Sequence, residues 1–425
     1  MFKLVTLALA YLAFASAQTG YTDWFDSTGT VVPTPYPTPG GTNVDRECGG
    51  DLSNLWLDVV VVVDNSKGMT NEGITEIAAN IVTVFGNGTK IGNQYSDPRS
   101  TRLGIVTYNK QATIVADLNL LQSIDDLYQT IFSVLNTVSN TDDSFLAKGI
   151  GAAESVLQNG RANGVRSNYK RLVVVYASAY KGEGENDPIP VSDRLKSSGV
   201  ILSTVAFDQD GDESLLAGLA VIASPNYAFT SKDLNLVGEL QGVALQSEFS
   251  SKYKPPNCFI PANCFCPNLW TQYKANFDDE YSYKYGVCIR AATISSSWTA
   301  AKFACQNLAK NGFLATEYDG QKHNFLFRVA QNNTAFTAPY IYHIGLSYVN
   351  GGWNWQQPAG YPLKPMSGYS TWNPSYPKSF SSNIGVLEQQ FSSDLTVGWQ
   401  NINAYSVAEY YMCEVASCDT EKYCS

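Results

Sequence analysis

The distribution of cysteine along the chain constrains its architecture more than any other feature. Cys48 stands near the start, the next cysteine is Cys258, and seven more follow it. The long segment between these two must fold on a hydrophobic core alone, whereas the later region can be held together by disulfides. We therefore expect two domains of different kinds, residues 55–248 and residues 264–425, joined by a linker at 249–263.

The N-terminal residues have the pattern of a secretory signal peptide. Lys3 supplies a positive charge, residues 4–14 are almost wholly apolar, and residues 15–17 have the small-x-small form of a cleavage site. The apolar run is too short to span a bilayer, so we expect removal of residues 1–17 and a mature start at Gln18. No later segment has a transmembrane pattern, and no lipid-anchor signal is evident. The sequence thus predicts a secreted, extracellular protein without a membrane anchor.

Composition excludes several kinds of partner and of chemistry. The net charge of −10 argues against nucleic acid and anionic membranes as partners. In an exported chain, nine cysteines predict disulfides, and the sequons at Asn87 and Asn332 predict glycosylation. The histidines number two, His323 and His343, and neither a Gly-x-Ser-x-Gly elbow nor a zinc-binding histidine cluster is present. We therefore do not expect an enzyme, and we expect His343 to be packed in a core strand.

The first domain alternates apolar runs with helical patterns. It follows a spacer, residues 18–54, in which proline recurs at every second position from Pro33 to Pro39 and favours a stiff extended form. Trp56 to Val63 is apolar except for Asp58, which fits a strand buried on both faces of a parallel sheet. Further strands are expected at 103–108, 112–118, 172–176 and 200–207, and helices at 74–85 and 144–157. This order predicts an α/β doubly wound sheet, in which ligands bind at the carboxyl ends of the strands.

Asp64 and Ser66 directly follow the first predicted strand and offer oxygen ligands to a hard cation such as Mg²⁺. The run from Leu57 to Ser66 resembles the opening of a von Willebrand factor A domain, and the order of elements matches over about residues 55–246. That family carries Asp-x-Ser-x-Ser after the first strand, a Thr in a second loop and an Asp in a third. Together these residues form a metal-ion-dependent adhesion site.

Only part of that metal site is retained. Asp64 and Ser66 match, Gly68 replaces the second Ser, Ser144 takes the Thr position, and Ser178 stands where the family has Asp. With one carboxylate lost, the resemblance implies that Mg²⁺ binds weakly or not at all. The alternative is that Asp64 and Ser66 only organise the turn. The acidic run 208–212 lacks the downstream Glu of a calcium loop, and we expect a solvated turn there.

The second domain carries an ordered set of cysteine and tryptophan motifs. These are Cys266-Pro267-Asn268-Leu269-Trp270, Gly286-Val287-Cys288, Trp298 to Cys305, His343-Ile344-Gly345-Leu346, Trp353-Asn354-Trp355, Trp399-Gln400-Asn401 and Tyr411-Met412-Cys413-Glu414. They resemble a long-form C-type lectin-like domain, with an α+β fold, over about residues 264–415. The whole chain resembles a secreted nematode-type protein that joins a von Willebrand factor A domain to a C-type lectin-like domain.

The lectin resemblance implies two disulfides, Cys305 with Cys413 and Cys266 with Cys288. Both positions of the third family bridge are lost together, since Gly385 and Ala404 occupy them. Because Cys48 and Cys258 flank the first domain and domain termini often lie close together, we expect a clasp between them. Cys264, Cys418 and Cys424 would then leave an odd thiol, through which chains could oligomerise.

The calcium ligands of sugar-binding lectins are also missing. Those relatives use Glu-Pro-Asn or Gln-Pro-Asp and an acidic pair near the last Trp, whereas this chain has Tyr376-Pro377-Lys378 and Asn401. Calcium-dependent sugar binding is therefore not expected, unless Glu388 or Asp394 supplies the missing oxygens. Trp372 and Tyr376 are the candidate ligand contacts, because aromatic faces stack on sugars and fill protein hot spots. The alternative is that these rings only pack the loop onto the domain.

Two functions remain open from the sequence. The first is a secreted recognition protein, which implies innate immune recognition or cell adhesion through an extracellular glycan or protein ligand, without cofactor. The second is a structural component of the extracellular matrix that recognises no sugar. Binding to microbial surfaces or glycans, as against binding to matrix proteins, distinguishes the two.

Overall fold

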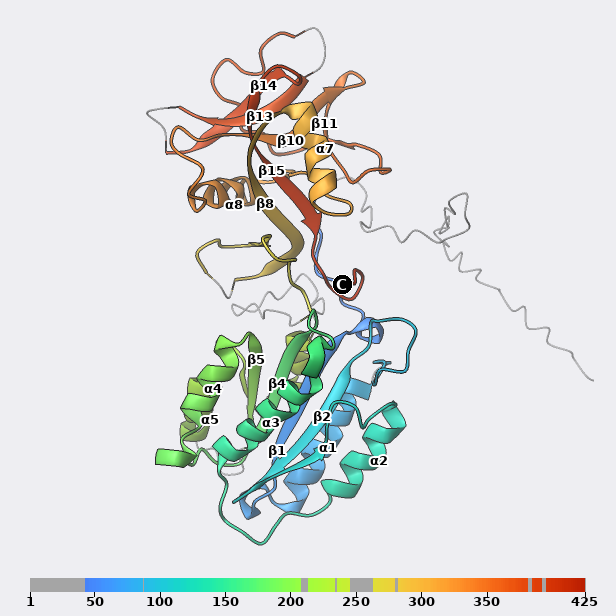
Figure 1. The fold of residues 1–425 in the computed structure, drawn as a ribbon. Coiled ribbons are helices and arrows are strands. Elements are labelled where there is room, and N and C mark those ends of the chain that lie inside the picture. The colour runs from blue at the N-terminus through green and yellow to red at the C-terminus, as the bar shows by residue number, and fades with distance from the viewer. Residues whose placement is uncertain are drawn as a thin grey trace, which may run out of the picture. The chain divides into compact units, whose positions relative to one another are not determined.

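The structure is a computed structural model that describes residues 43–86, 88–207, 213–233, 235–244, 263–279, 282–380, 384–391 and 395–424 (Figure 1). The predicted signal peptide, Asn87, the acidic run 208–212, Cys258 and Asp394 lie outside these residues. No helix in the described part of the chain is both long and apolar enough to cross a membrane.

The first domain is built on one six-stranded sheet with the strand order β3-β2-β1-β4-β5-β6. All neighbouring strands are parallel except the edge strand β3, which pairs antiparallel with β2. The strands are β1 (Leu57–Asp64), β2 (Arg102–Tyr108), β3 (Ala112–Ala116), β4 (Lys170–Ala177), β5 (Val200–Ala206) and β6 (Ala228–Thr230). The helices are α1 (Asn71–Gly86), α2 (Ile124–Val134), α3 (Leu146–Gly160), α4 (Pro188–Ser197), α5 (Glu213–Ile222) and α6 (Leu236–Ala244).

Strand β1 lies inside this sheet and contributes side chains to the hydrophobic cores on both of its faces. Val59 and Val61 pack with α1, α2 and α6 on one face, whereas Val60 and Val62 pack with α3, α4 and α5 on the other. This arrangement is the doubly wound α/β fold that the continuous apolar run predicts (Figure 1). Asp58, the break in that run, is fully buried, and its carboxylate accepts hydrogen bonds from the Arg102 guanidinium at 2.9 and 2.7 Å.

The second domain is an α+β fold around a nine-stranded sheet, in which β12-β11-β10-β15-β8-β7 form the main path and β13 joins β10 to β14. Its strands are β7 (Thr271–Lys274), β8 (Lys284–Ser297), β9 (Phe313–Leu314), β10 (Ile341–Val349), β11 (Gly352–Trp355), β12 (Lys364–Pro365), β13 (Ile384–Gln390), β14 (Val397–Asn403) and β15 (Ala408–Ala416). Its helices are α7 (Trp298–Leu308) and α8 (Gly320–Gln331). His343 lies on β10 with no exposed surface, as expected of a packed histidine, and burial lowers its pKa to about 4.

The disulfides agree with the lectin resemblance and correct the clasp. Cys305 is bridged to Cys413 and Cys266 to Cys288, the two pairs that the resemblance implies. The predicted pair of Cys48 with Cys258 is wrong, because Cys48 is bridged to Cys264. Cys418 and Cys424 are bridged to each other, so the eight described cysteines are all paired.

The residues just before β1 bond to the second domain, although the sequence assigns them to the spacer. Besides the Cys48 bridge, the Arg46 guanidinium donates hydrogen bonds to the carboxylate of Asp419, one of them at 2.9 Å. Asp45 forms an ion pair with the buried ammonium of Lys322 on α8. The second domain is therefore bonded to a segment that precedes the first domain in the sequence.

Candidate functional site

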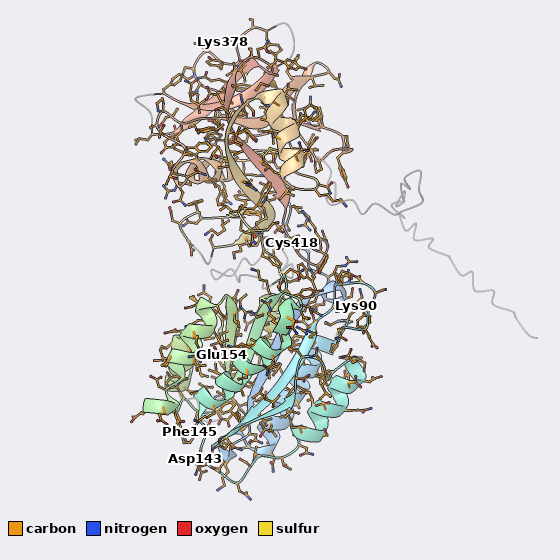
Figure 2. All side chains as sticks on the ribbon, viewed as in Figure 1. Lys90, Asp143, Phe145, Glu154, Lys378 and Cys418 are labelled. Atoms are coloured by element: carbon orange, nitrogen blue, oxygen red, sulfur yellow. A yellow bond between two sulfur atoms is a disulfide. The ribbon has the colours of Figure 1, made fainter. Side chains whose placement is uncertain are left out.

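The four predicted adhesion-site residues of the first domain meet at the carboxyl end of its sheet. Asp64 ends β1, Ser66 follows it, Ser144 precedes α3 and Ser178 follows β4. The hydroxyls of Ser144 and Ser178 donate hydrogen bonds to Asp64 Oδ2 at 2.8 and 2.6 Å, and the Ser66 N–H donates to Asp64 Oδ1 at 2.8 Å. Asp143 and Phe145, which flank Ser144, mark this end of the sheet in Figure 2. Both oxygens of the one carboxylate are therefore hydrogen-bonded, and a cation would compete with these donors.

One glycine and two lysines surround this cluster. A Cβ added to Gly68 would lie 2.8 Å from Ser178 Oγ, so the glycine leaves room for the serine that replaces the family Asp. Lys67 lies 3.8 Å from the Asp142 carboxylate, and Lys181 donates to the Asp142 carbonyl at 2.9 Å. Two ammonium groups therefore lie on the loops that form the cluster, beside the carboxylate and the carbonyl of Asp142.

The loop where sugar-binding relatives hold calcium is closed by hydrogen bonds in this chain. The Lys378 backbone N–H donates to Asn401 Oδ1 at 2.7 Å, and Asn401 Nδ2 donates to the Lys378 carbonyl at 2.9 Å. Asn401 thus bonds directly to the triplet position. The ammonium of Lys378 lies 4.6 Å from the centre of the Tyr376 ring.

The two candidate contact residues differ in how they are held. Trp372 packs against Trp353 and Trp399, with ring centres 4.8 and 5.5 Å apart. Its ring therefore supports the domain, as the packing alternative expects. Tyr376 is half-buried, and among the described residues its ring packs against neither Trp353 nor Trp399. We retain Tyr376 as the stronger candidate contact.

Aromatic packing occupies the place of the missing third bridge. A Cβ added to Gly385 would lie 2.3 Å from the Trp298 indole, and Trp298 and Ala404 belong to the same buried cluster. The Trp298 N–H donates to the Ile344 carbonyl at 2.7 Å. Trp298 therefore packs between the two positions that a disulfide would join.

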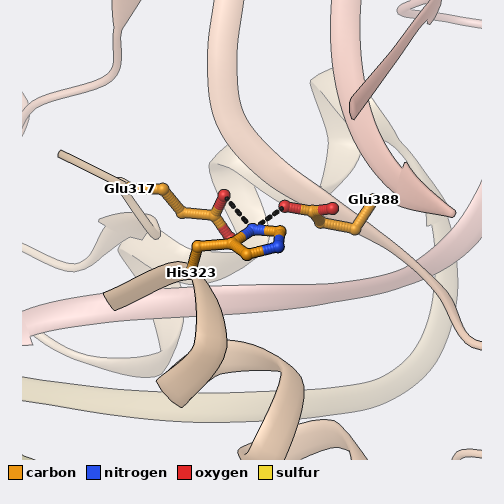
Figure 3. A group of neighbouring side chains, drawn as sticks. All are labelled: Glu317, His323 and Glu388. Carbon is orange, nitrogen blue, oxygen red and sulfur yellow. Dashed lines mark hydrogen bonds and ion pairs between the residues drawn. The ribbon is translucent and has the colours of Figure 1, made fainter. Parts of the chain in front are cut away.

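A buried acidic and imidazole cluster in the second domain was missed by the sequence reasoning. The Nδ1 atom of His323 lies 3.1 Å from Glu317 Oε2 and 3.0 Å from Glu388 Oε1 (Figure 3). Burial alone disfavours the imidazolium, but the charges of Glu317 and Glu388 outweigh it and raise the pKa of His323 to about 12. Glu388 therefore points into the core, which is the wrong place for the loop calcium ligand considered above. One sequence signal for this cluster was available. Glu388 stands two residues after Val386 on an apolar strand, and residues two apart on a strand face the same side.

Comparison with known proteins assigns both domains. The von Willebrand factor type A domain model matches residues 58–243, and the lectin C-type domain model matches residues 294–415. The chain contains a von Willebrand factor type A domain followed by a C-type lectin domain. Both are typically non-catalytic binding domains, which implies an extracellular ligand.

A nematode protein is similar to this chain over most of the chain's length. The chain is 27% identical to C-type lectin domain-containing protein 160 of Caenorhabditis elegans over 417 residues, which are 93% of this chain and 58% of the relative. The chain therefore spans little more than half the length of that relative.

Solved structures match parts of this chain. Proximal thread matrix protein 1 from the mussel byssus is 20% identical, with a TM-score of 0.36 over 46% of this chain and 47% of its own. A calcium-independent type II antifreeze protein is 21% identical, with a TM-score of 0.26 over 36% of this chain and 96% of its own. Human lithostathine is 19% identical, with a TM-score of 0.28 over 36% of this chain and 99% of its own.

The four adhesion-site residues of the von Willebrand domain allow a gain-of-function test of metal binding. We expect Ser178→Asp to raise the affinity for Mg²⁺ at least roughly tenfold, because affinity follows the number of ligand charges. Ser178→Asn, which matches aspartate in size without its charge, should leave binding as weak as in the wild type. Titration calorimetry of the full chain measures both. Submillimolar binding by the wild-type chain would show that one carboxylate and hydroxyls suffice.

Proposed function

We propose that this chain is a secreted recognition protein whose lectin domain binds an extracellular glycan or protein ligand without calcium, in innate immune recognition or cell adhesion. One observation carries the proposal: Asn401 and Lys378 hydrogen-bond to each other across the position where calcium-dependent relatives hold the ion. Calcium in proteins takes six to eight oxygen ligands with carboxylates among them. An amide, a lysine and a tyrosine offer a different surface, suited to hydrogen bonding and stacking.

Other features support an extracellular binding role. Four disulfides join the eight described cysteines, as is usual in exported proteins. Asn332, the described sequon, is exposed at the end of α8, where a glycan can be attached without disturbing the core. The predicted odd thiol among Cys264, Cys418 and Cys424 is wrong, because Cys264 is bridged to Cys48 and the other two are bridged to each other.

The proposal assigns ligand contact to Tyr376 in the lectin domain. We expect Tyr376→Ala to weaken binding roughly tenfold, because losing an aromatic hot-spot residue costs more than about 1 kcal/mol. The measurement is binding of the full chain to immobilised glycans, microbial surfaces and matrix proteins. Surface plasmon resonance then gives the affinity for whichever surface is bound.

Two controls make the result interpretable. Tyr405→Ala removes an exposed tyrosine of the same domain and should leave binding unchanged. Trp372→Ala removes a ring that also packs the domain, so its effect counts only if far-ultraviolet circular dichroism and the melting temperature are preserved. Unchanged binding by Tyr376→Ala would remove this loop from the ligand site. Binding to matrix proteins alone, with no glycan or microbial surface bound, would favour the structural role instead.

A further inference from the structure

Glu317, His323 and Glu388 form a group of metal-ligand side chains outside the loop assigned to recognition. They come from three separate elements, the segment after β9, helix α8 and strand β13 (Figure 3). Their ligand atoms all lie within 4.8 Å of one another. Both glutamate side chains are fully buried, and the histidine side chain is 6% exposed. Among the described residues, this is the group of such side chains that could share an ion.

Several polar atoms at this cluster have no hydrogen-bond partner among the described residues. One oxygen of each carboxylate, Glu317 Oε1 and Glu388 Oε2, is buried without a hydrogen bond. The hydroxyl of Tyr342, whose residue is paired with Glu388 across β10 and β13, is also buried and unpartnered. Buried polar groups in native proteins are almost always satisfied by protein, water or an ion. The cluster therefore lacks a bonding partner.

A neighbouring side chain orients one of the carboxylates. The Trp399 indole N–H donates to Glu317 Oε2 at 2.7 Å, and Trp399 is fully buried. Donors of this kind fix the direction of metal-ligating carboxylates in known sites.

We propose that Glu317, His323 and Glu388 bind a divalent transition-metal ion, with Zn²⁺ the best match, as a structural site in the lectin domain. Zinc accepts imidazole nitrogen and carboxylate oxygen at about 2.0–2.2 Å in tetrahedral geometry, which sets neighbouring ligand atoms roughly 3.4 Å apart. The observed separations of 3.1 and 3.0 Å from Nδ1 are close to that value. On binding, the ion displaces the proton from His323 Nδ1 to solvent, its two charges balance the two carboxylates, and the Tyr342 hydroxyl or a water completes the shell.

The donor set argues against the other divalent ions of extracellular fluid. Ca²⁺ needs six to eight oxygen ligands, and Mg²⁺ keeps several waters in octahedral geometry. A buried site with an imidazole nitrogen and two carboxylates provides neither. The ion would tie α8 to β13, and it would lie in the core, apart from the Lys378 and Asn401 loop.

The test is the metal content and thermal stability of the full chain, untagged and carrying Cys258→Ser so that the ninth cysteine supplies no zinc ligand. We expect roughly one zinc per chain after incubation with Zn²⁺ and dialysis, and a melting temperature several degrees above that of the chelated protein. His323→Gln and Glu388→Gln should each lose the ion. His343→Gln, which changes the other histidine, should keep it.

A second readout needs no variant. Because the chain has two histidines, nitrogen NMR of labelled imidazoles resolves both, and zinc should shift the Nδ1 signal of His323 alone. Absence of bound zinc in the wild-type chain, together with an unshifted His323 signal, would overturn the proposal and leave a water or a shared proton as the missing partner. Retention of zinc by both His323→Gln and Glu388→Gln would overturn it as well.

Discussion

Replacing Lys322 by methionine lowers the free energy of unfolding of the lectin domain by about 3–5 kcal/mol, because breaking a buried ion pair leaves uncompensated charge in the core. Lys322 has no exposed surface. Its ammonium donates to Thr316 Oγ1 and to Glu414 Oε2, each at 2.9 Å, and to the carboxylate of Asp45. Methionine fills a similar volume but leaves both carboxylates without a cation.

Urea unfolding with the disulfides intact measures this effect, and tryptophan fluorescence suits it because six of the eight tryptophans lie in the lectin domain. The matched control is Lys310→Met, an exposed lysine on the same domain, for which the change should stay within about 0.5 kcal/mol. A loss below about 1 kcal/mol for Lys322→Met would mean that the two carboxylates find other partners.

Removing the Cys305–Cys413 disulfide has the second largest effect, a loss of about 2–5 kcal/mol. The bridge closes a loop with a sequence separation of 108, and both cysteines are fully buried. Cross-links over long loops restrict the unfolded chain most, and the double substitution to alanine also leaves a gap between α7 and β15. Both cysteines are changed together so that no thiol is left to exchange.

The Cys418–Cys424 pair provides the comparison, since its sequence separation is 6. Its removal by the same double substitution should cost clearly less, and the same unfolding measurement gives both values. Equal losses would show that loop length does not govern how these bridges act.

The fold could be predicted where a local pattern determines it. The apolar run of β1 is buried on both faces, so it predicted the central strand directly. The lectin fold was implied by the resemblance of the ordered cysteine and tryptophan motifs to that family. Asp58 interrupts that run, and its buried carboxylate is paired with Arg102 on the adjacent strand β2, 44 residues later. No residue close to Asp58 in the sequence indicates that pairing.

The sites could be predicted only in part, for the same reason. Asp64, Ser66, Ser144 and Ser178 follow strands or precede a helix whose ends meet at one sheet edge, so topology brings them together. The partner of Cys48 was wrongly assigned because Cys258 and Cys264 are six residues apart, and flanking position does not distinguish them. Glu317, His323 and Glu388 converge from three elements through packing, which no local pattern encodes.

The central claim, recognition without calcium, is tested most directly by the affinity of the full chain for the surface identified in the binding screen. It should be measured in millimolar Ca²⁺, in EDTA, and after EDTA with either Ca²⁺ or Zn²⁺ restored. We predict the same dissociation constant with calcium present or absent, because Asn401 and Lys378 occupy the calcium position with their own hydrogen bonds. Restoration by Zn²⁺ alone would concern the buried cluster, not the loop. Binding that is lost in EDTA and restored by Ca²⁺ alone would contradict the account.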